Sequence, residues 1–349
     1  MTNGWDQLSS AMAALNRELR EKAPDGATAD EGEAYVARVL TASLNDGFLS
    51  HLLTEDGFSR ALPTRGAPNP DYVMQHAMLD STRGYQLTGC LNDSERIGVG
   101  LFSRAEGGSM EIAEYLYIHP SNADGAGNFQ VNIAADAQGA NALKLRPDAC
   151  LLLVRTLHRH RNGAPARLRL QGASAPADLA LSGSSTAAAL ARATQITIGS
   201  VRQFLSWSEQ AAAYPNQFRG QVEGLAQTVQ GEPDTEYYLG YFELAGHQVL
   251  QVTMPSDLNC YWSIHAYNHW CEYLPGASAH DLNTQADGDG NIVISIGPRL
   301  AANTENPIDT RGRHRGVLLC RVTGGTLPDP PTTTVVNLQP QEGPGDGVH

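Results

Sequence analysis

The stretch DGAGNFQVNI (residues 124–133) returns as DGDGNIVISI at residues 287–296. Two further pairs follow in the same order. NALKLR at 141–146 matches NPIDTR at 306–311, and LLLVR at 151–155 matches VLLCR at 317–321. The offsets are 163, 165 and 166 residues. Each copy reads as turn, strand, loop and strand, so the sequence predicts two related β modules.

The composition agrees with a turn-rich β protein. The 349 residues are enough for two domains or one large composite domain, and they include 35 glycines and 19 prolines. A formal net charge of −13 disfavours a broad basic surface, so we expect no nucleic-acid partner and no anionic membrane partner. Two basic clusters, residues 158–161 and 311–315, are interpreted as solvated loops.

The five cysteines form no Cys-x-x-Cys pair, and Cys150 and Cys320 adjoin apolar runs that suggest buried thiols. The start of the chain does not show a basic region followed by an apolar stretch, and no segment has about 18 uninterrupted apolar residues. These features predict a reduced, cytoplasmic protein.

Helical periodicity is confined to the start and the middle of the chain. Trp5, Leu8, Met12, Leu15 and Leu19 form one apolar stripe, and Thr28–Glu31 is a plausible capping box for a second helix. We expect N-terminal helices in 1–60, a first β module in 69–170, a linker and helical segment in 171–235, a second β module in 236–337 and a disordered tail in 338–349. The N-terminal helices are candidates for a homo-oligomer contact.

Between residues 261 and 267 the sequence alternates in a way that indicates a strand with an unusual face. Tyr261, Ser263, His265 and Tyr267 share one face, and Trp262, Ile264 and Ala266 share the other. Buried polar groups need partners. The first face therefore either lines a wet cavity for a small-molecule ligand or supports a hydrogen-bonded core network.

Metal and cofactor signals are weak. His265, His269 and Glu272 would share a face on a helix, but the strand pattern separates residues four apart by roughly 13 Å. Asp287-x-Asp289-x-Asn291 has some calcium-loop character, although Asp124-Gly125 and Asp287-Gly288 are more typical of hairpin turns. Because no phosphate loop or dinucleotide fingerprint is present, we expect neither a metal nor a cofactor.

Repeated polar pairs have a structural interpretation. Asn141 with Arg146, and Asn306 with Arg311, could brace the same loop in both modules. Arg155 and Arg321 end matching apolar strands, and we expect each to pair with a carboxylate.

The second module contains YWSI at 261–264 and YNHWCEYL at 267–274, followed by Leu282-Asn283, Asp287-Gly288 and Arg321. With the earlier NPDY at 69–72, this pattern resembles the bacterial domain-of-unknown-function 1214 family across most of residues 69–336. Pro307-Ile308 and Arg313-His314 depart from the family's usual residues. The resemblance implies a jelly-roll-type β-sandwich with helical additions and no established reaction.

These observations predict a mainly β protein: two related jelly-roll-like β-sandwich modules with helical N-terminal and inter-module segments. The functional hypothesis is a cofactor-independent lyase, dehydratase or isomerase acting on a small, partly apolar oxygenated compound. The candidate catalytic residues are His265, Tyr261 and Tyr267. The candidate binding residues are Ser263, Asn268, Trp270, Glu272, His280, Asn283, Arg311 and His314.

The alternative is a non-catalytic sandwich that binds carbohydrate or lipid through Trp262, Trp270 and Tyr273. In either case we expect the main pocket to border the second module, closed by the helical segment of residues 185–213. The reason is that the titratable residues of the polar strand are present in only one of the two copies.

Overall fold

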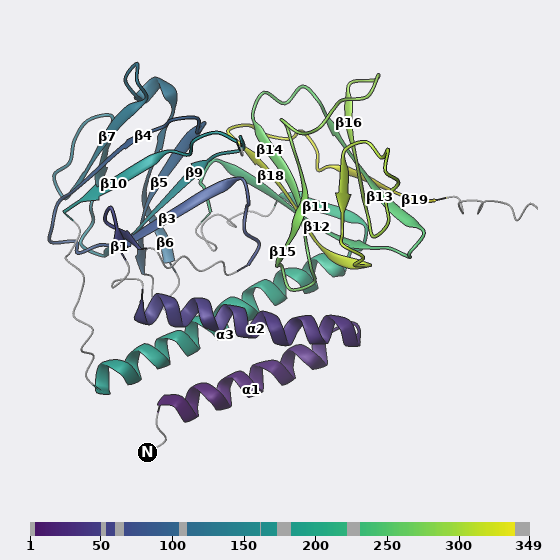
Figure 1. Cartoon of the computed structure of the whole chain (residues 1–349), viewed down its shortest axis with the longest axis horizontal. Coiled ribbons are helices and arrows are strands. Elements are labelled where there is room, and N and C mark those ends of the chain that lie inside the picture. Colours follow the sequence, from purple (N-terminus) through teal and green to yellow (C-terminus); the bar gives the residue numbers. More distant parts are fainter. Residues whose placement is uncertain are drawn as a thin grey trace, which may run out of the picture. The chain divides into compact units, whose positions relative to one another are not determined.

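The computed structural model describes residues 4–49, 54–59, 66–104, 110–160, 162–172, 183–221 and 231–338. The chain divides into two compact units (Figure 1). The first unit is Met1–Val201 with Gly224–Pro233, and the second is Arg202–Glu223 with Asp234–His349. Among the described residues, no helix is both long and apolar enough to span a membrane.

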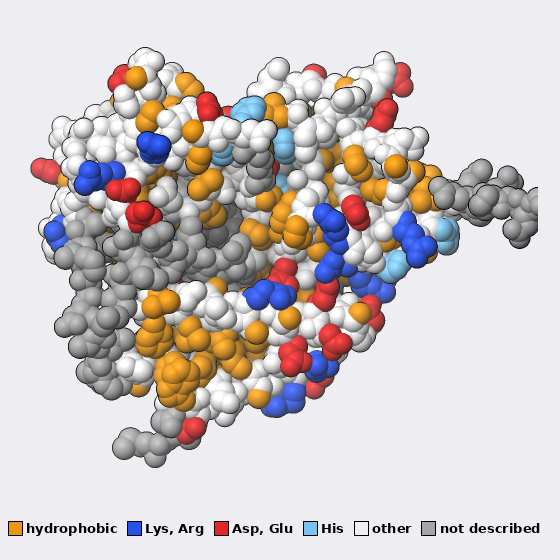
Figure 2. Space-filling view, viewed as in Figure 1, with side chains coloured by type: hydrophobic (Ala, Val, Ile, Leu, Met, Phe, Trp, Pro, Cys, Tyr) orange, Lys and Arg blue, Asp and Glu red, His pale blue; other side chains and the backbone are white. Residues whose placement is uncertain are grey.

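The helices of the described chain are α1 (Gly4–Lys22), α2 (Gly26–Phe48) and α3 (Gly183–Ala212), besides the short 3-10 turn η1 (Pro120–Asn122). The predicted stripe of α1 is buried at Leu8, Met12, Leu15 and Leu19. Trp5 continues that stripe in sequence but is 58% exposed. Figure 2 shows hydrophobic side chains gathered over the helices on one face. An oligomer contact through the N-terminal helices stays a prediction.

The start of α2 corrects one sequence expectation. The N-cap is Asp25, whose carboxylate accepts the Thr28 amide at 2.7 Å. Thr28, the predicted cap, is buried inside the first turn. The reason is that Asp25 has an extended backbone and a carboxylate within reach of the first free amides, which favours it as the cap.

The first unit contains a small ribbon and two four-stranded sheets. The ribbon is β1 (Thr54–Glu55) with β2 (Phe58–Ser59). One sheet has the order β10-β4-β7-β8, formed by Arg167–Gln171, Tyr85–Cys90, Asn128–Ala134 and Ala142–Lys144. The other has the order β3-β9-β5-β6, formed by Tyr72–Met78, Ala149–Leu157, Arg96–Arg104 and Met110–Ile118. Only β7 and β8 pair in parallel among these strands.

The second unit also contains two sheets. One has the order β19-β13-β16-β17, formed by Thr332–Asn337, Gln248–Pro255, Asn291–Gly297 and Pro307–Asp309. The other has the order β11-β12-β18-β14-β15, formed by Gln217–Gln221, Thr235–Glu243, Arg315–Thr323, Tyr261–Tyr267 and Tyr273–His280. The β16–β17 pair is parallel, as its counterpart β7–β8 is in the first unit.

The two units therefore have the same strand order, with β11 added at one edge of the second. Register confirms the match: Arg155 on β9 pairs with Gly98 on β5, and Arg321 on β18 pairs with Ser263 on β14. The internal repeat is a duplicated β-sandwich, and the mainly β prediction is confirmed.

Each sandwich has an apolar core between its two sheets. In the second unit Trp262, Ile264 and Ala266 of β14 belong to this core. In the first unit Val99 and Val154 occupy the corresponding inner face. Large apolar side chains on facing strands account for the close packing, since burial removes their surface from water.

The repeated Asp-Gly stretches form the same turn in both units. Asp124 accepts the amides of Ala126 and Asn128, and Asp287 accepts those of Asp289 and Asn291 at 3.0 and 2.9 Å. Both turns close on a glycine with φ near 80°. The predicted turns are present, but they are not hairpin turns between paired strands, because β6 and β7, and likewise β15 and β16, belong to different sheets. In each turn one carboxylate oxygen accepts two backbone amides.

Candidate functional site

Strand β14 buries both of its faces. Trp262, Ile264 and Ala266 point into the sandwich core, so the predicted alternation is correct. On the opposite face Ser263, His265 and Tyr267 are completely buried and Tyr261 is nearly so. The face is filled by a hydrogen-bonded network, which was one of the two interpretations left open by the sequence.

Arg321 is the centre of this network. Its guanidinium donates to the Tyr267 hydroxyl at 2.9 Å and lies 3.3 Å from His265 Nδ1. The rings of His265 and Tyr273 meet edge to face at 5.9 Å. We call Arg321, Tyr267 and His265 the Arg321 network. The predicted carboxylate partner is replaced in these contacts by a phenol and an imidazole.

The electrostatics of the Arg321 network are set by burial. Burial raises the pKa of Tyr267 to about 12, and the Arg321 guanidinium opposes that shift. Burial acts to lower the pKa of Arg321, but the neighbouring tyrosines Tyr267 and Tyr237 outweigh it and raise that pKa. At neutral pH the site therefore combines a fixed positive charge with a protonated phenol.

A second buried group lies at the turn after β14. His269 Nδ1 contacts the Tyr241 hydroxyl at 2.8 Å and the Ser208 hydroxyl of α3 at 3.2 Å. Asn268 caps the turn by accepting the amides of Trp270 and Glu272. The C-terminal part of α3 thus packs against the turn after β14. Its predicted role in closing a pocket stays a prediction.

The metal hypothesis required His265, His269 and Glu272 to share one face of a helix, and the structure does not place them on a helix. His265 belongs to a regular strand and faces Arg321, whereas His269 belongs to the turn and faces Tyr241. Within the described ranges, no group of three or more His, Cys, Asp or Glu side chains is placed to hold a metal ion.

Among the remaining predicted binding residues, Asn283, Arg311 and His314 lie in loops or turns, whereas His280 is the last residue of β15 and pairs with Ser263 of β14. Asn283 accepts the His280 amide at 2.6 Å, and His280 Nδ1 accepts the Leu282 amide. The exposed Arg311 donates to the Pro275 carbonyl, and His314 Nδ1 contacts the Leu244 carbonyl at 3.0 Å. These contacts brace loops.

The aromatic platform of the alternative hypothesis is not accessible. Trp262 and Trp270 are 1% and 0% exposed, which leaves only Tyr273 of that set partly exposed. Cys271 is no better placed for nucleophilic chemistry. Burial, followed by the nearby Glu272 carboxylate, raises the pKa of the Cys271 thiol well above its ordinary value.

The matching face of the first unit holds a network that the sequence did not predict. Its centre is Glu232, which is 4% exposed. The carboxylate accepts the Tyr72 hydroxyl at 2.6 Å and the Tyr115 hydroxyl at 3.3 Å, and it lies 3.1 Å from Arg96. Arg96 also stacks over the Tyr117 ring at 4.5 Å. We call this set the Glu232 network.

Arg155 occupies in the first unit the position that Arg321 occupies in the second. It is 7% exposed, and its positive charge acts to lower the pKa of the Tyr115 hydroxyl. Burial, followed by the Glu232 charge, raises the pKa of Tyr115 well above its usual value. In both units a buried arginine on the outer face of the sheet thus influences a protonated tyrosine, and in the second unit it also donates a hydrogen bond to it.

The two networks differ at two positions on the central strand. Gly98 and Gly100 of β5 correspond in register to Ser263 and His265 of β14. In the first unit Tyr115 lies across the glycines: a Cβ on Gly98 would come within 2.3 Å of its hydroxyl. The serine and the histidine are therefore present in only one copy.

Replacing Gly98 by alanine is expected to destabilise the first unit by about 1–3 kcal/mol. The added methyl would also lie 2.7 Å from a Glu232 carboxylate oxygen, so the Glu232 network would have to open. Urea unfolding followed by circular dichroism measures the effect. Gly199→Ala is the control, because a Cβ there meets no atom within 4 Å. Equal stability of the Gly98 variant and the wild type would contradict the packing.

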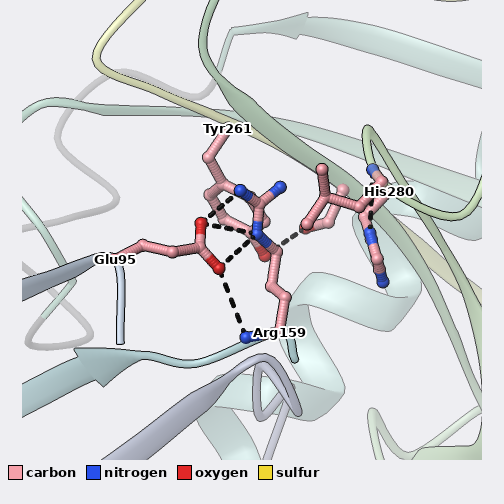
Figure 3. A network of polar contacts seen from close by, with 6 residues as sticks. Glu95, Arg159, Tyr261 and His280 are labelled. Carbon is pink, nitrogen blue, oxygen red and sulfur yellow. Dashed lines mark hydrogen bonds and ion pairs between the residues drawn. The ribbon is translucent and has the colours of Figure 1, made fainter. Parts of the chain in front are cut away.

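The sequence suggested that the basic cluster at residues 158–161 is a solvated loop. Its first two residues, His158 and Arg159, do not fit that interpretation. His158 is buried and contacts the Ser94 hydroxyl at 3.3 Å. Arg159 forms an ion pair with Glu95, with Nε at 2.9 and 2.8 Å from the two carboxylate oxygens (Figure 3). The Glu95 carboxylate, next to β5, compensates the charge of Arg159 and accounts for the burial of its side chain. Arg161 lies outside the described residues.

The hollows of the described surface lie on the other sheets. A hollow of about 650 Å³ lies over β10, β4 and β7 in the first unit, between side chains such as Thr88, Gln130 and Arg169. One of about 340 Å³ lies over β13 and β16 in the second, beside Val249 and Ser295. The larger of these two hollows is in the first unit and the smaller is in the second, and neither is lined by β14. A main pocket beside the second module, closed by residues 185–213, stays a prediction. The β14 face is packed by its own tyrosines and His265.

Comparison with solved structures shows that the fold occurs elsewhere. An uncharacterized protein from Burkholderia cenocepacia has 22% sequence identity and a TM-score of 0.83, with 96% of each chain covered. A protein from Vibrio parahaemolyticus has 13% identity and a TM-score of 0.47, covering 87% of this chain and all of the other. The first likeness shows the fold alone, and the second is too distant to support an argument.

No family model matches the chain. No curated protein matches it either. The resemblance to the domain-of-unknown-function 1214 family therefore stays a prediction, and any function has to be argued from the side chains.

Proposed function

We propose that the second unit is a cofactor-independent enzyme that performs acid–base chemistry on a small, partly apolar oxygenated compound at the Arg321 network. The observation that carries the proposal is the direct contact of a buried arginine with His265 and Tyr267 on the outer face of a sheet. A merely structural sandwich has no need of a histidine there, because the first unit has Gly100 at the same position.

In this proposal His265 has the proton-transfer role. A guanidinium can only donate hydrogen bonds, so His265 Nδ1 is the acceptor of the Arg321 contact and the ring proton resides on Nε2. When a substrate takes over the Arg321 guanidinium, Nδ1 of His265 is free to accept a proton from that substrate. The resulting imidazolium returns a proton to the substrate at another position, which restores the neutral ring.

Tyr267 is better suited to positioning than to proton donation. With a pKa of about 12 its hydroxyl stays protonated at neutral pH, and it receives the Arg321 hydrogen bond. Tyr261 donates to the Ser263 hydroxyl at 2.9 Å and holds it in place. Because the whole face is buried, substrate reaches His265 only when the covering segments move, of which α3 is one candidate.

Turnover of a metabolite library by the full-length protein, followed by mass spectrometry, tests the proposal. We expect His265→Gln to lower the turnover of a converted compound by about 10²–10⁴-fold while retaining its binding. The control is His247→Gln, in a loop before β13 and away from the network. Binding without any product, unchanged by His265→Gln, would refute the enzyme and favour the non-catalytic alternative.

A further inference from the structure

In the first unit, the outer face of the sheet β3-β9-β5-β6 binds a carboxylate, that of Glu232. Glu232 does not belong to either sheet; it lies in the segment before β12. Its carboxylate nevertheless reaches the strands and receives hydroxyl donors from Tyr72 on β3 and Tyr115 on β6, with Arg96 of β5 beside it. The sheet thus holds a carboxylate that the sheet itself does not supply.

The second unit has hydrogen-bond donors at the equivalent positions. By strand register, the residues that contact Glu232, namely Tyr72, Arg96 and Tyr115, correspond to Thr235, Tyr261 and Ser278. On the same face, Gly98 and Arg155 correspond to Ser263 and Arg321. Four of these five second-unit residues carry hydroxyl groups and the fifth is a guanidinium; all but the partly exposed Ser278 are buried. Thr235 also hydrogen-bonds Thr323 across the strands at 2.8 Å. This combination is suited to a carboxylate, whose oxygens only accept hydrogen bonds.

We infer that Arg321, Tyr261, Ser263 and Thr235 bind the carboxylate of a small molecule in the second unit, as the first unit binds Glu232. This carboxylate site rests on the proposed function, because it assigns the substrate class of the same Arg321 network. Tyr261 and His280, which corresponds to Tyr117 by register, are shown in Figure 3. Leu319 lies on the same face of β18, so the remainder of the acid would meet an apolar side chain.

The acid–base chemistry follows from this placement. His265 corresponds to Gly100, which lies two residues beyond Gly98, and the Glu232 carboxylate lies next to Gly98. His265 would therefore lie beside the carbon chain of the acid rather than on its carboxylate. A proton next to a carboxylate is removed or added in elimination and isomerisation of carboxylic acids. Such a substrate needs a fixed cation at one end and a neutral imidazole at the other.

Titration of the full-length protein with a series of acids, acetate, butyrate and benzoate, tests the carboxylate site. The neutral amides of the same acids serve as matched probes, and inorganic phosphate tests whether any oxyanion suffices. Binding is followed by tryptophan fluorescence, since Trp207, Trp262 and Trp270 all lie in the second unit. We expect at least one acid to bind saturably, and its amide and phosphate to bind at least about tenfold more weakly.

The variants use the duplication as an internal control. Arg321→Lys keeps the charge but loses the planar fork, and we expect affinity for the acid to fall about tenfold or more. Arg155→Lys makes the same change in the first unit, where Glu232 occupies the site, and we expect it to change affinity less than twofold. Ser263→Ala, a small change in a packed strand, should weaken the acid about threefold to tenfold and serves if Arg321→Lys does not fold.

Several outcomes would overturn the inference. They are equal affinity for acid and amide, tighter binding of phosphate, loss of binding in Arg155→Lys, or unchanged binding in both second-unit variants. Acid binding that His265→Gln leaves intact, with no library compound converted, would refute the enzyme but retain the carboxylate site. Conversion of uncharged compounds alone, with no acid bound, would retain the enzyme and remove the carboxylate site.

Discussion

Replacing Glu232 by glutamine is expected to lower the free energy of unfolding of the first unit by about 3–5 kcal/mol. Arg96 and Arg155 would both remain buried, but the first unit would lose the negative charge of Glu232, which lies 3.1 Å from Arg96. The Tyr72 hydroxyl would also lose a charge-assisted acceptor at 2.6 Å. Urea unfolding by circular dichroism gives the energy. Hydrogen exchange in peptides of β3 and β5 assigns it to the first unit.

The matched control is Glu243→Gln. Glu243 forms an ion pair with Arg315 at 3.4 Å, but its side chain is 48% exposed. Water screens such a pair, so we expect a change of about 0.2–1 kcal/mol at most. If the two variants were equally stable, Glu232 would not be the buried counter-charge of the network, and the model for a carboxylate on the sheet face would lose its basis.

The duplication was readable from sequence because it rests on local rules. A turn that needs Asp and Gly, followed by an alternating strand, keeps those residues in both copies, and Asp124 and Asp287 indeed accept the same amides. The alternation of Tyr261–Tyr267 was likewise correct, because a central strand has only two faces. Local periodicity therefore predicted the architecture and which side chains share the face of His265.

The same rules could not predict what covers that face. A polar strand face is compatible with a cavity or with a filled network, and the choice depends on side chains from distant strands. Arg321 reaches Tyr267 across 54 positions of sequence, and Ser208 reaches His269 across 61. Because those contacts are not encoded by spacing along the chain, the sequence left both alternatives open for the β14 face, where the structure has a packed network.

Glu232 was missed for a related reason. It lies between Gly231 and Pro233, which read as an ordinary linker turn, and it meets Tyr72 across 160 positions. One signal was available. Arg96 and Arg155 are cations within or beside apolar strands, and a buried cation requires compensation. That demand predicts a carboxylate somewhere in the chain but does not say which one.

The pH dependence of stability offers a test of the Arg321 network that needs no ligand. Burial raises the pKa of Tyr267 from 10.0 to about 12, so the folded second unit holds this proton more tightly than the unfolded chain does. The resulting stability is fully present below pH 10 and is lost as pH rises toward about 12. The loss is on the order of 1 kcal/mol at about pH 11 and on the order of 3 kcal/mol once both states are ionised.

Urea unfolding by tryptophan fluorescence at about pH 9 and about pH 11 measures this loss in the second unit, where Trp207, Trp262 and Trp270 lie. Other groups titrate in the same range, so the readout is the difference between variants. Tyr267→Phe cannot ionise, and its pH-dependent loss should be smaller than that of the wild type by on the order of 1 kcal/mol. Tyr214→Phe, at a side chain that is 46% exposed, should behave as the wild type does. An identical loss in Tyr267→Phe and the wild type would mean that the Tyr267 hydroxyl is not buried against Arg321, and the proposed positioning of the guanidinium would have to be abandoned.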